Sequence, residues 1–113
     1  AALKNPNVVK VLVAHDGKAV YFSRFPIPYS RGAIPTDVNR LVPLHHLGIY
    51  VYTRETLLKF AALPPTPWEV AESLEQLRAL YHGIPIGIAR ANCASTGVDT
   101  HEDLEFVRRA MLV

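Results

Sequence analysis

The sequence has little cysteine, little excess charge and no long apolar run, and each scarcity argues against a class of protein. Cys93 is the only cysteine among 113 residues, so neither an internal disulfide nor a cysteine-based zinc site can form. The net charge is +2 and no basic cluster is longer than Arg108-Arg109, which argues against a nucleic-acid surface. The longest apolar runs are short, and Lys10 interrupts one of them, so no membrane span or signal peptide is indicated. We expect a protein of a reducing cytosol, with neither nucleic acid nor membrane as a partner.

Length and composition favour one compact domain spanning residues 1–113. Half of the residues (50%) are hydrophobic and 19% are charged, which suits a packed core and argues against disorder. The chain begins at Ala1 without a methionine and soon enters a strand-like run. A processed start, a recombinant product or a piece of a longer protein would each explain this, and composition does not distinguish them.

Runs of β-branched and aromatic residues predict strands at residues 8–13, 20–22, 44–53 and 84–90. Asp16-Gly17 is a strong turn signal that makes the first two strands a hairpin. Residues 25–43 carry four prolines, which remove backbone donors and predict a long loop.

Three threonines predict the starts of three helices, after Thr53, Thr66 and Thr100. The first helix would end near residue 63 and the second near residue 82, before Gly83. In the second helix the expected buried face consists of Val70, Leu74, Leu77 and Tyr81. The last helix would bury a stripe made of Leu104, Phe106, Val107 and Met111. The resulting order, β-β-loop-β-α-α-β-α, favours an α/β fold with a mixed sheet and flanking helices.

Asp99 follows the fourth predicted strand and precedes the last helix, a place where ligand sites of α/β sheets gather. Its carboxylate could hold Mg²⁺, which prefers one or two carboxylates together with substrate phosphates. The alternative is a turn residue that binds local backbone amides.

Other polar residues also have two interpretations. His46 and Tyr50 lie four apart on one face of the predicted third strand, where they could line a pocket or belong to a half-buried strand face. Glu75 and Gln76 could bind a hydroxyl-rich ligand, or they could belong to a solvated helix face, with Gln76 nearly opposite the apolar side. Arg24, at one end of the proline-rich loop, could grip a carboxylate or a phosphate, or be a surface arginine.

Several segments taken together resemble one enzyme family. The segments "YFSRFPIPYSR", "HHLGIYVYTRETL", "PTPWEVAESLEQLR" and "STGVDTHEDLEFVRR" are similar, in order and spacing, to the C-terminal half of the 3-deoxy-manno-octulosonate cytidylyltransferases, or CMP-Kdo synthetases. The resemblance runs from about Asn5 to Arg109. It implies part of the nucleotide-diphospho-sugar transferase fold, a cytosolic enzyme that is typically a homodimer, and a role in lipopolysaccharide synthesis.

The resemblance also implies a reaction and a site. Such enzymes join CTP to the sugar acid Kdo, release pyrophosphate and require Mg²⁺. By motif, Asp99 would be a metal ligand, and the sugar acid would be bound by Arg24, His46, Tyr50, Glu75 and Gln76. The family's N-terminal nucleotide-binding half and its second metal-binding aspartate have no counterpart here. We therefore expect a chain that is inactive without a complementing N-terminal half, or alternatively a non-catalytic dimerisation or partner-binding module derived from the enzyme.

The sequence departs from the family pattern at three positions. Ser95 stands where the family motif has a glycine, His101 where it has a proline, and His45 where an arginine is common. The first change would stiffen the loop that presents Asp99, because serine has less backbone freedom than glycine.

Overall fold

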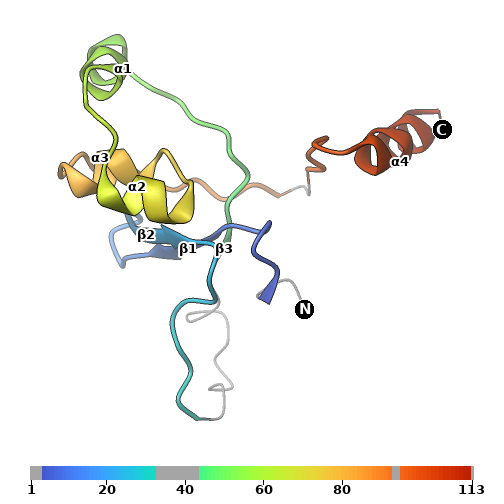
Figure 1. Ribbon diagram of the computed structural model, residues 1–113, viewed down its shortest axis with the longest axis horizontal. Helices are drawn as coiled ribbons and strands as arrows, with labels where there is room; N and C mark the ends of the chain where they lie inside the picture. The colour runs from blue at the N-terminus through green and yellow to red at the C-terminus, as the bar shows by residue number, and fades with distance from the viewer. Residues whose placement is uncertain (1–3, 33–43, 93–94, 113) are drawn as a thin grey trace.

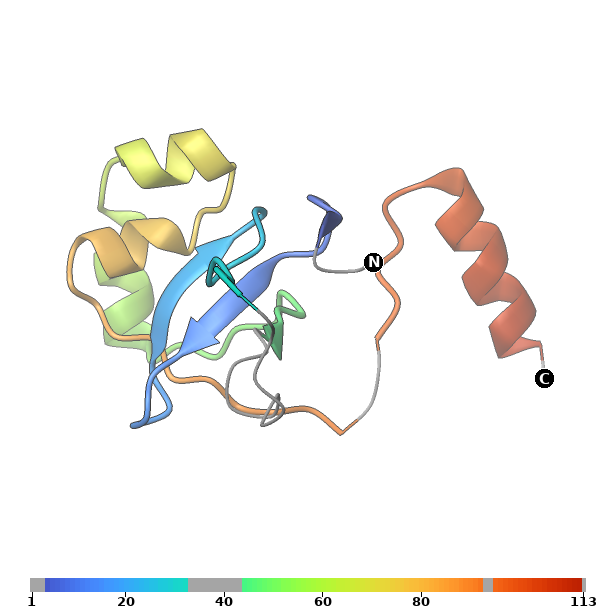
Figure 2. The same ribbon diagram turned by 90° about the horizontal axis from the view of Figure 1, so that it is seen from below.

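The structure, a computed structural model, describes residues 4–32, 44–92 and 95–112. Its elements are β1 (Lys10–Val13), β2 (Ala19–Ser23), β3 (Leu44–His45), α1 (Arg54–Ala61), α2 (Pro67–Glu72), α3 (Leu77–Tyr81) and α4 (His101–Met111). The three strands form one antiparallel sheet in the order β2-β1-β3. Helices α2 and α3 lie over one face of this sheet, whereas α1 and α4 stand away from it (Figures 1 and 2).

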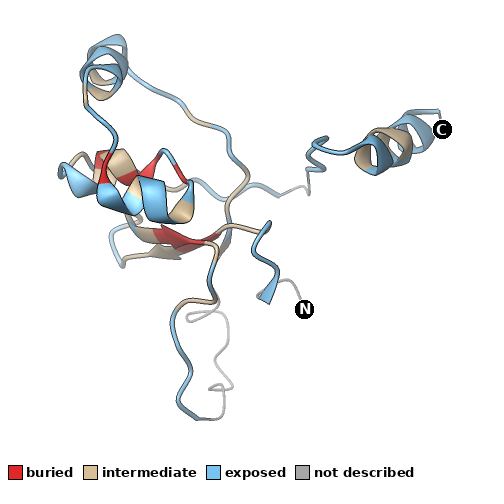
Figure 3. Ribbon diagram, viewed as in Figure 1, coloured by how far each residue is buried: buried red, intermediate tan, exposed pale blue. Residues whose placement is uncertain are grey.

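The predicted hairpin is confirmed and forms the base of the core. Gly17 has φ +83°, a left-handed conformation that glycine adopts readily, and it turns the chain from β1 into β2. The register places Val11 opposite Phe22. Both side chains are buried and pack with Leu74 and Leu77 from the helical layer. In Figure 3 the buried parts, in red, lie on the sheet and on the helical layer that covers it. Burial of each such side chain stabilises the fold by about 1.5–3 kcal/mol.

The two later strands were predicted too long. The third, expected over residues 44–53, is the two-residue β3, and after His46 the chain leaves the sheet edge. Gly48 has φ +70°, which is incompatible with a continuing strand and gives the physical reason. The fourth, expected over residues 84–90, is an isolated bridge between Lys18 and Gly87, because the hairpin turn offers it only a few backbone partners.

All three helix caps are confirmed. The side chains of Thr53, Thr66 and Thr100 each accept a hydrogen bond from the third residue that follows. The carboxylates of Glu69 and Asp103 in turn accept hydrogen bonds from the backbone N–H groups of Thr66 and Thr100. These reciprocal bonds complete two capping boxes.

The single helix predicted to run from Thr66 to residue 82 is wrong, because the helix breaks in the middle. Ser73 adopts the left-handed conformation, with φ 52° and ψ 48°, and separates α2 from α3. A tertiary contact from Arg24 lies at the break. Arg24 Nε donates to the carbonyl of Glu72 at 2.7 Å and Nη2 donates to that of Ser73 at 3.2 Å. A continuous helix would use these two carbonyls for its own ladder.

The break changes which residues are buried. Gln76, expected nearly opposite the apolar face, is only 5% exposed, while Val70 of the expected apolar face is 68% exposed. Leu74 and Leu77 are buried as predicted. The identity of the buried residues after Ser73 therefore follows from the tertiary contact and not from helical periodicity.

The buried stripe predicted for α4 is also wrong in this chain. Phe106 is 63% exposed and Met111 is 79% exposed, because the sheet and its covering helices lie elsewhere (Figure 3). Among the described residues, no helix combines the length and the apolar content that crossing a membrane requires. Cys93 and residues 33–43 of the proline-rich loop lie outside the described residues.

Candidate functional site

A pocket of about 940 Å³ opens between the sheet, the extended segment that follows β3, and residues 84–92. Its walls are mainly apolar, with a few polar side chains among them. Residues that line it include Phe22, His46, Tyr50, Gln76, Ile86 and Arg90. The pocket therefore brings together three residues selected from the sequence. His46 and Tyr50 come from the segment that follows β3, and Gln76 comes from the α2–α3 junction.

His46 and Tyr50 form the aromatic wall of this pocket. Their ring centroids are 5.3 Å apart, and the His46 ring packs edge-on against the buried Phe22 at 5.0 Å. Burial lowers the pKa of His46, with a smaller electrostatic contribution from the neighbouring His45, and this favours the neutral imidazole. Burial raises the pKa of Tyr50. The pocket thus presents a phenolic hydroxyl and a neutral imidazole, which together can donate and accept hydrogen bonds.

Tyr50 is supported by a row of stacked side chains that the sequence analysis did not identify. Tyr50 lies 5.9 Å from Tyr52, and Tyr52 lies 6.1 Å from Phe60 of α1, measured between ring centroids. The Arg78 guanidinium lies 5.1 Å from the centroid of the Phe60 ring. The alternation of Tyr50 and Tyr52 could have placed both tyrosines on one face, but nothing in the sequence predicted the contact with α1.

Arg78 is in turn fixed by an ion pair with Glu69. The guanidinium Nε donates to Glu69 Oε2 at 2.9 Å, and Nη2 donates to Oε1. The hydrogen bond from Arg78 lowers the pKa of Glu69. This pair ties α3 to the start of α2 and holds the last member of the aromatic row in place.

Gln76 carries an unsatisfied hydrogen-bond donor. Its Nε2 is buried and has no partner within the part of the chain that the structure describes. A buried amide that lacks a partner costs about 1–3 kcal/mol. Native proteins keep few such groups, and one that lines a pocket is a group that a bound ligand could satisfy.

Glu75 lies beside the pocket but does not line it. Its side chain is exposed. After burial and the neighbouring Tyr52, the negative charge of Glu75 is the third cause of the raised pKa of Tyr50. The carboxylate is therefore close enough to influence the tyrosine hydroxyls from the rim.

The structure places Arg24 outside the pocket lining. Its guanidinium donates to the backbone carbonyls of Pro6, Glu72 and Ser73 at 3.0, 2.7 and 3.2 Å. Its own backbone N–H donates to Glu72 Oε2 at 2.7 Å. Arg24 thus joins the N-terminal segment, the end of β2 and the α2–α3 junction.

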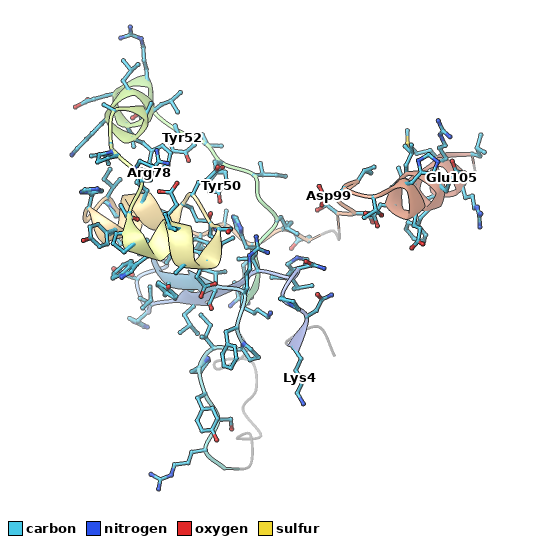
Figure 4. All side chains as sticks on the ribbon, viewed as in Figure 1. Lys4, Tyr50, Tyr52, Arg78, Asp99 and Glu105 are labelled. Atoms are coloured by element: carbon cyan, nitrogen blue, oxygen red, sulfur yellow. The ribbon has the colours of Figure 1, made fainter. Side chains whose placement is uncertain are left out.

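Asp99 is exposed and lies at the start of α4, away from the pocket (Figure 4). Its backbone N–H donates to Asp103 Oδ2 at 3.2 Å, so the neighbouring Asp103 carboxylate serves the helix cap. Within residues 4–32, 44–92 and 95–112, no group of three or more His, Cys, Asp and Glu side chains could hold a metal ion. Asp99 alone fits Mg²⁺ as one carboxylate ligand, provided that phosphate oxygens or other polypeptide supply the rest.

Comparisons with known proteins agree on one family. A family model described as Cytidylyltransferase matches residues 1–88. The 3-deoxy-manno-octulosonate cytidylyltransferase of Acidobacterium capsulatum is 48% identical over 110 residues, and that of Neisseria gonorrhoeae is 47% identical over 111 residues. A solved structure of CMP:2-keto-3-deoxy-manno-octonic acid synthetase complexed with CTP superposes with a TM-score of 0.84 at 41% sequence identity.

These matches cover nearly all of this chain but less than half of each relative. The alignments span 97% and 94% of the chain against 43% and 44% of the two curated relatives. The solved structure is matched over 99% of this chain and 45% of its own. The α/β class is confirmed, and the structural neighbour is an enzyme of the nucleotide-diphospho-sugar transferase fold.

Proposed function

Because the chain belongs to the cytidylyltransferase family, we propose that it is the sugar-binding part of a CMP-Kdo synthetase. The reaction would transfer CMP from CTP to 3-deoxy-manno-octulosonate (Kdo), with release of pyrophosphate, for lipopolysaccharide synthesis. Support comes from the curated relatives, which are named for this cytidylyl transfer, and from the structural neighbour, which was solved with CTP. The chain spans less than half the length of these relatives.

The observation that carries the proposal is the buried Gln76 Nε2, which has no hydrogen-bond partner among the described residues and belongs to the pocket that also holds His46 and Tyr50. A sugar acid offers several hydroxyls, each of which can accept one hydrogen bond and donate another. The amide would donate to one hydroxyl, and the neutral imidazole and the phenol would serve others. Glu75 at the rim would accept from a further hydroxyl. Arg24 was expected to bind the sugar directly, but its guanidinium donates to backbone carbonyls, and these contacts favour an indirect role.

In the proposed reaction the anomeric hydroxyl of Kdo attacks the α-phosphorus of CTP in line. The new bond joins this oxygen to the α-phosphorus, while the bond from the α-phosphorus to the bridging oxygen breaks and pyrophosphate leaves. Catalysis of this kind depends on positioning and on stabilising developing charge. The pocket residues contribute by holding the sugar so that its anomeric hydroxyl points toward the nucleotide. Asp99 would supply one ligand to Mg²⁺, which when bound spreads the negative charge of the phosphates.

The nucleotide part of the site would come from polypeptide outside this sequence. We propose that the chain alone does not turn over CTP and that it works in the cytoplasm together with a complementing N-terminal half. Homodimer formation is part of the same proposal. A partner polypeptide would also account for the exposed apolar side chains of α4, Phe106 and Met111, which a finished enzyme would be expected to cover.

Calorimetric titration of the chain with Kdo tests the sugar site. The wild-type chain should bind Kdo, and Tyr50→Phe, which removes only the hydroxyl, should weaken binding by about two- to tenfold, the value of one hydrogen bond. Tyr81→Phe is the matched control, because Tyr81 is half exposed on α3 and is not part of the pocket wall. Absence of Kdo binding, or equal affinity of Tyr50→Phe and the wild type, would contradict the assignment of the pocket.

The second candidate is a non-catalytic dimerisation or partner-binding module derived from the enzyme. The exposed apolar side chains of α4 favour it, because an unpaired apolar helix face marks an interaction surface. This candidate predicts stable association of the chain without any recovery of activity when an N-terminal half is added. Light scattering together with pyrophosphate release separates the two.

A further inference from the structure

The local sequence does not explain the break between α2 and α3. Between Pro67 and Tyr81 the sequence contains no glycine and no further proline, and most of its residues are good helix formers. The chain nevertheless leaves the helix at Ser73, in a left-handed conformation that non-glycine residues rarely adopt. Such a conformation persists only where the surrounding structure enforces it.

Arg24 supplies the enforcing contacts. Its side chain donates to the carbonyls of Glu72 and Ser73, the two carbonyls that a continuous helix would offer to residues 76 and 77. The Glu72 carboxylate is held as well, by Ser23 Oγ at 2.6 Å and by the backbone N–H of Arg24 at 2.7 Å. Ser23 and Arg24, at the end of β2, therefore bind both the backbone carbonyls and the Glu72 carboxylate at the end of α2.

The break determines where Gln76 points. On a continuous helix Gln76 would lie about 140° around the axis from the face of Val70 and Leu74, on the solvated side. In the structure it is 5% exposed and lines the pocket beside His46. Its burial follows from the turn at Ser73.

We propose that Arg24 is a positioning residue of the sugar pocket, which holds the helix break at Ser73 and thereby turns Gln76 into the pocket, without touching the sugar itself. The proposal rests on the proposed function only for the identity of the ligand. The conformational part, that Arg24 sets the orientation of Gln76, stands independently of any ligand.

The conformational part is tested by NMR on the full chain without sugar. The Ser73 ¹³Cα and ¹³Cβ shifts report its left-handed conformation, and solvent exchange of the Gln76 side-chain amide protons reports its burial. Arg24→Ala should move the Ser73 shifts toward helical values and expose the Gln76 amide. Arg54→Ala, which removes an exposed arginine from α1, should change neither. Should Arg24→Ala fail to fold, Arg24→Lys carries the same comparison, because lysine keeps the aliphatic stem and charge but lacks the planar fork.

The effect on binding is tested by a second substitution that should restore Kdo affinity only if Arg24 does not contact the sugar directly. Arg24→Ala should weaken Kdo binding by about five- to tenfold, the loss of a hydrogen bond from Gln76. Adding Ser73→Gly to Arg24→Ala should restore most of the affinity, because glycine adopts the left-handed conformation without enforcement and stops the helix. Ser73→Gly alone should bind as the wild type does.

The outcomes separate this inference from the proposed function. If Arg24→Ala leaves Ser73 left-handed and Gln76 buried, or if Ser73→Gly does not rescue the lost affinity, Arg24 does not act through Gln76 and the inference is overturned. If the wild-type chain binds no Kdo, the sugar assignment fails, and the NMR comparison still decides whether Arg24 positions Gln76.

Discussion

Replacing Gln76 by methionine should make the chain more stable and at the same time weaken its binding of Kdo. Gln76 is 5% exposed, and its Nε2 lacks a partner in the described part of the chain. Methionine has a similar size and flexibility but no donor that must be desolvated. Removing an unsatisfied buried donor raises the free energy of unfolding by about 1–3 kcal/mol, and imperfect packing of the new side chain lowers it by up to about 1.5 kcal/mol.

The expected net effect is a gain of about 1 kcal/mol in the free energy of unfolding, or roughly 4–8 °C in Tm for a domain of this size. Urea unfolding followed by fluorescence measures it, because Trp68 is the single tryptophan and packs against Tyr21 and Tyr81. Calorimetry with Kdo on the same variant should show binding weakened at least about fivefold, since the donor is gone.

Leu77→Met is the matched control, because it places methionine at the first residue of α3, the fully buried apolar position that directly follows Gln76. It should lower stability by up to about 1.5 kcal/mol and leave Kdo binding intact. A Gln76→Met chain that is less stable than the wild type would refute the reasoning, because it would mean that the amide is satisfied in the folded protein. Unchanged Kdo affinity would refute the role of Gln76 in the pocket.

Three further outcomes follow from the structure. The hydrogen bond from Arg78 lowers the pKa of Glu69, so the contribution of this carboxylate is complete above the ordinary glutamate value of about 4.3 and is lost as the pH falls through the lowered pKa. The stability difference between the wild type and Glu69→Gln, measured by urea unfolding, should therefore shrink below about pH 4. Thr100→Ala removes the α4 cap and should speed amide exchange in that helix by the equivalent of about 1 kcal/mol, while the Trp68 unfolding transition stays in place. Phe106→Ser should change the free energy of unfolding by less than about 0.5 kcal/mol, because Phe106 is 63% exposed; a larger loss would show that α4 packs on the body in solution.

Local signals in the sequence predicted the local features of the fold. The Asp16-Gly17 turn and the threonine caps depend on nearby residues, and all of them are confirmed. The strand ends and the helix break depend on partners far along the chain. At the break the carbonyls of Glu72 and Ser73 accept hydrogen bonds from Arg24, a partner that no pattern within residues 67–81 could have revealed.

The candidate site divides in the same way. Strand alternation predicted that His46 and Tyr50 share a face, and they do meet in the pocket, although the strand ends at His45. Gln76 was assigned by family resemblance, whereas helical periodicity placed it on the solvated side; the structure places it in the pocket for a reason that periodicity could not contain. The roles of Arg24 and Asp99 toward sugar and metal stay predictions, because both lie outside the pocket lining.

Pyrophosphate release measured with CTP, Kdo and Mg²⁺ tests most directly the claim that this chain is the sugar-binding part of a two-part enzyme. The chain alone should release none. The same chain mixed with the N-terminal half of a relative, such as that of Acidobacterium capsulatum, should release pyrophosphate, and the Asp99→Asn chain in the same mixture should not. Turnover by the isolated chain, or no turnover from a mixture in which the two halves demonstrably associate, would contradict the account.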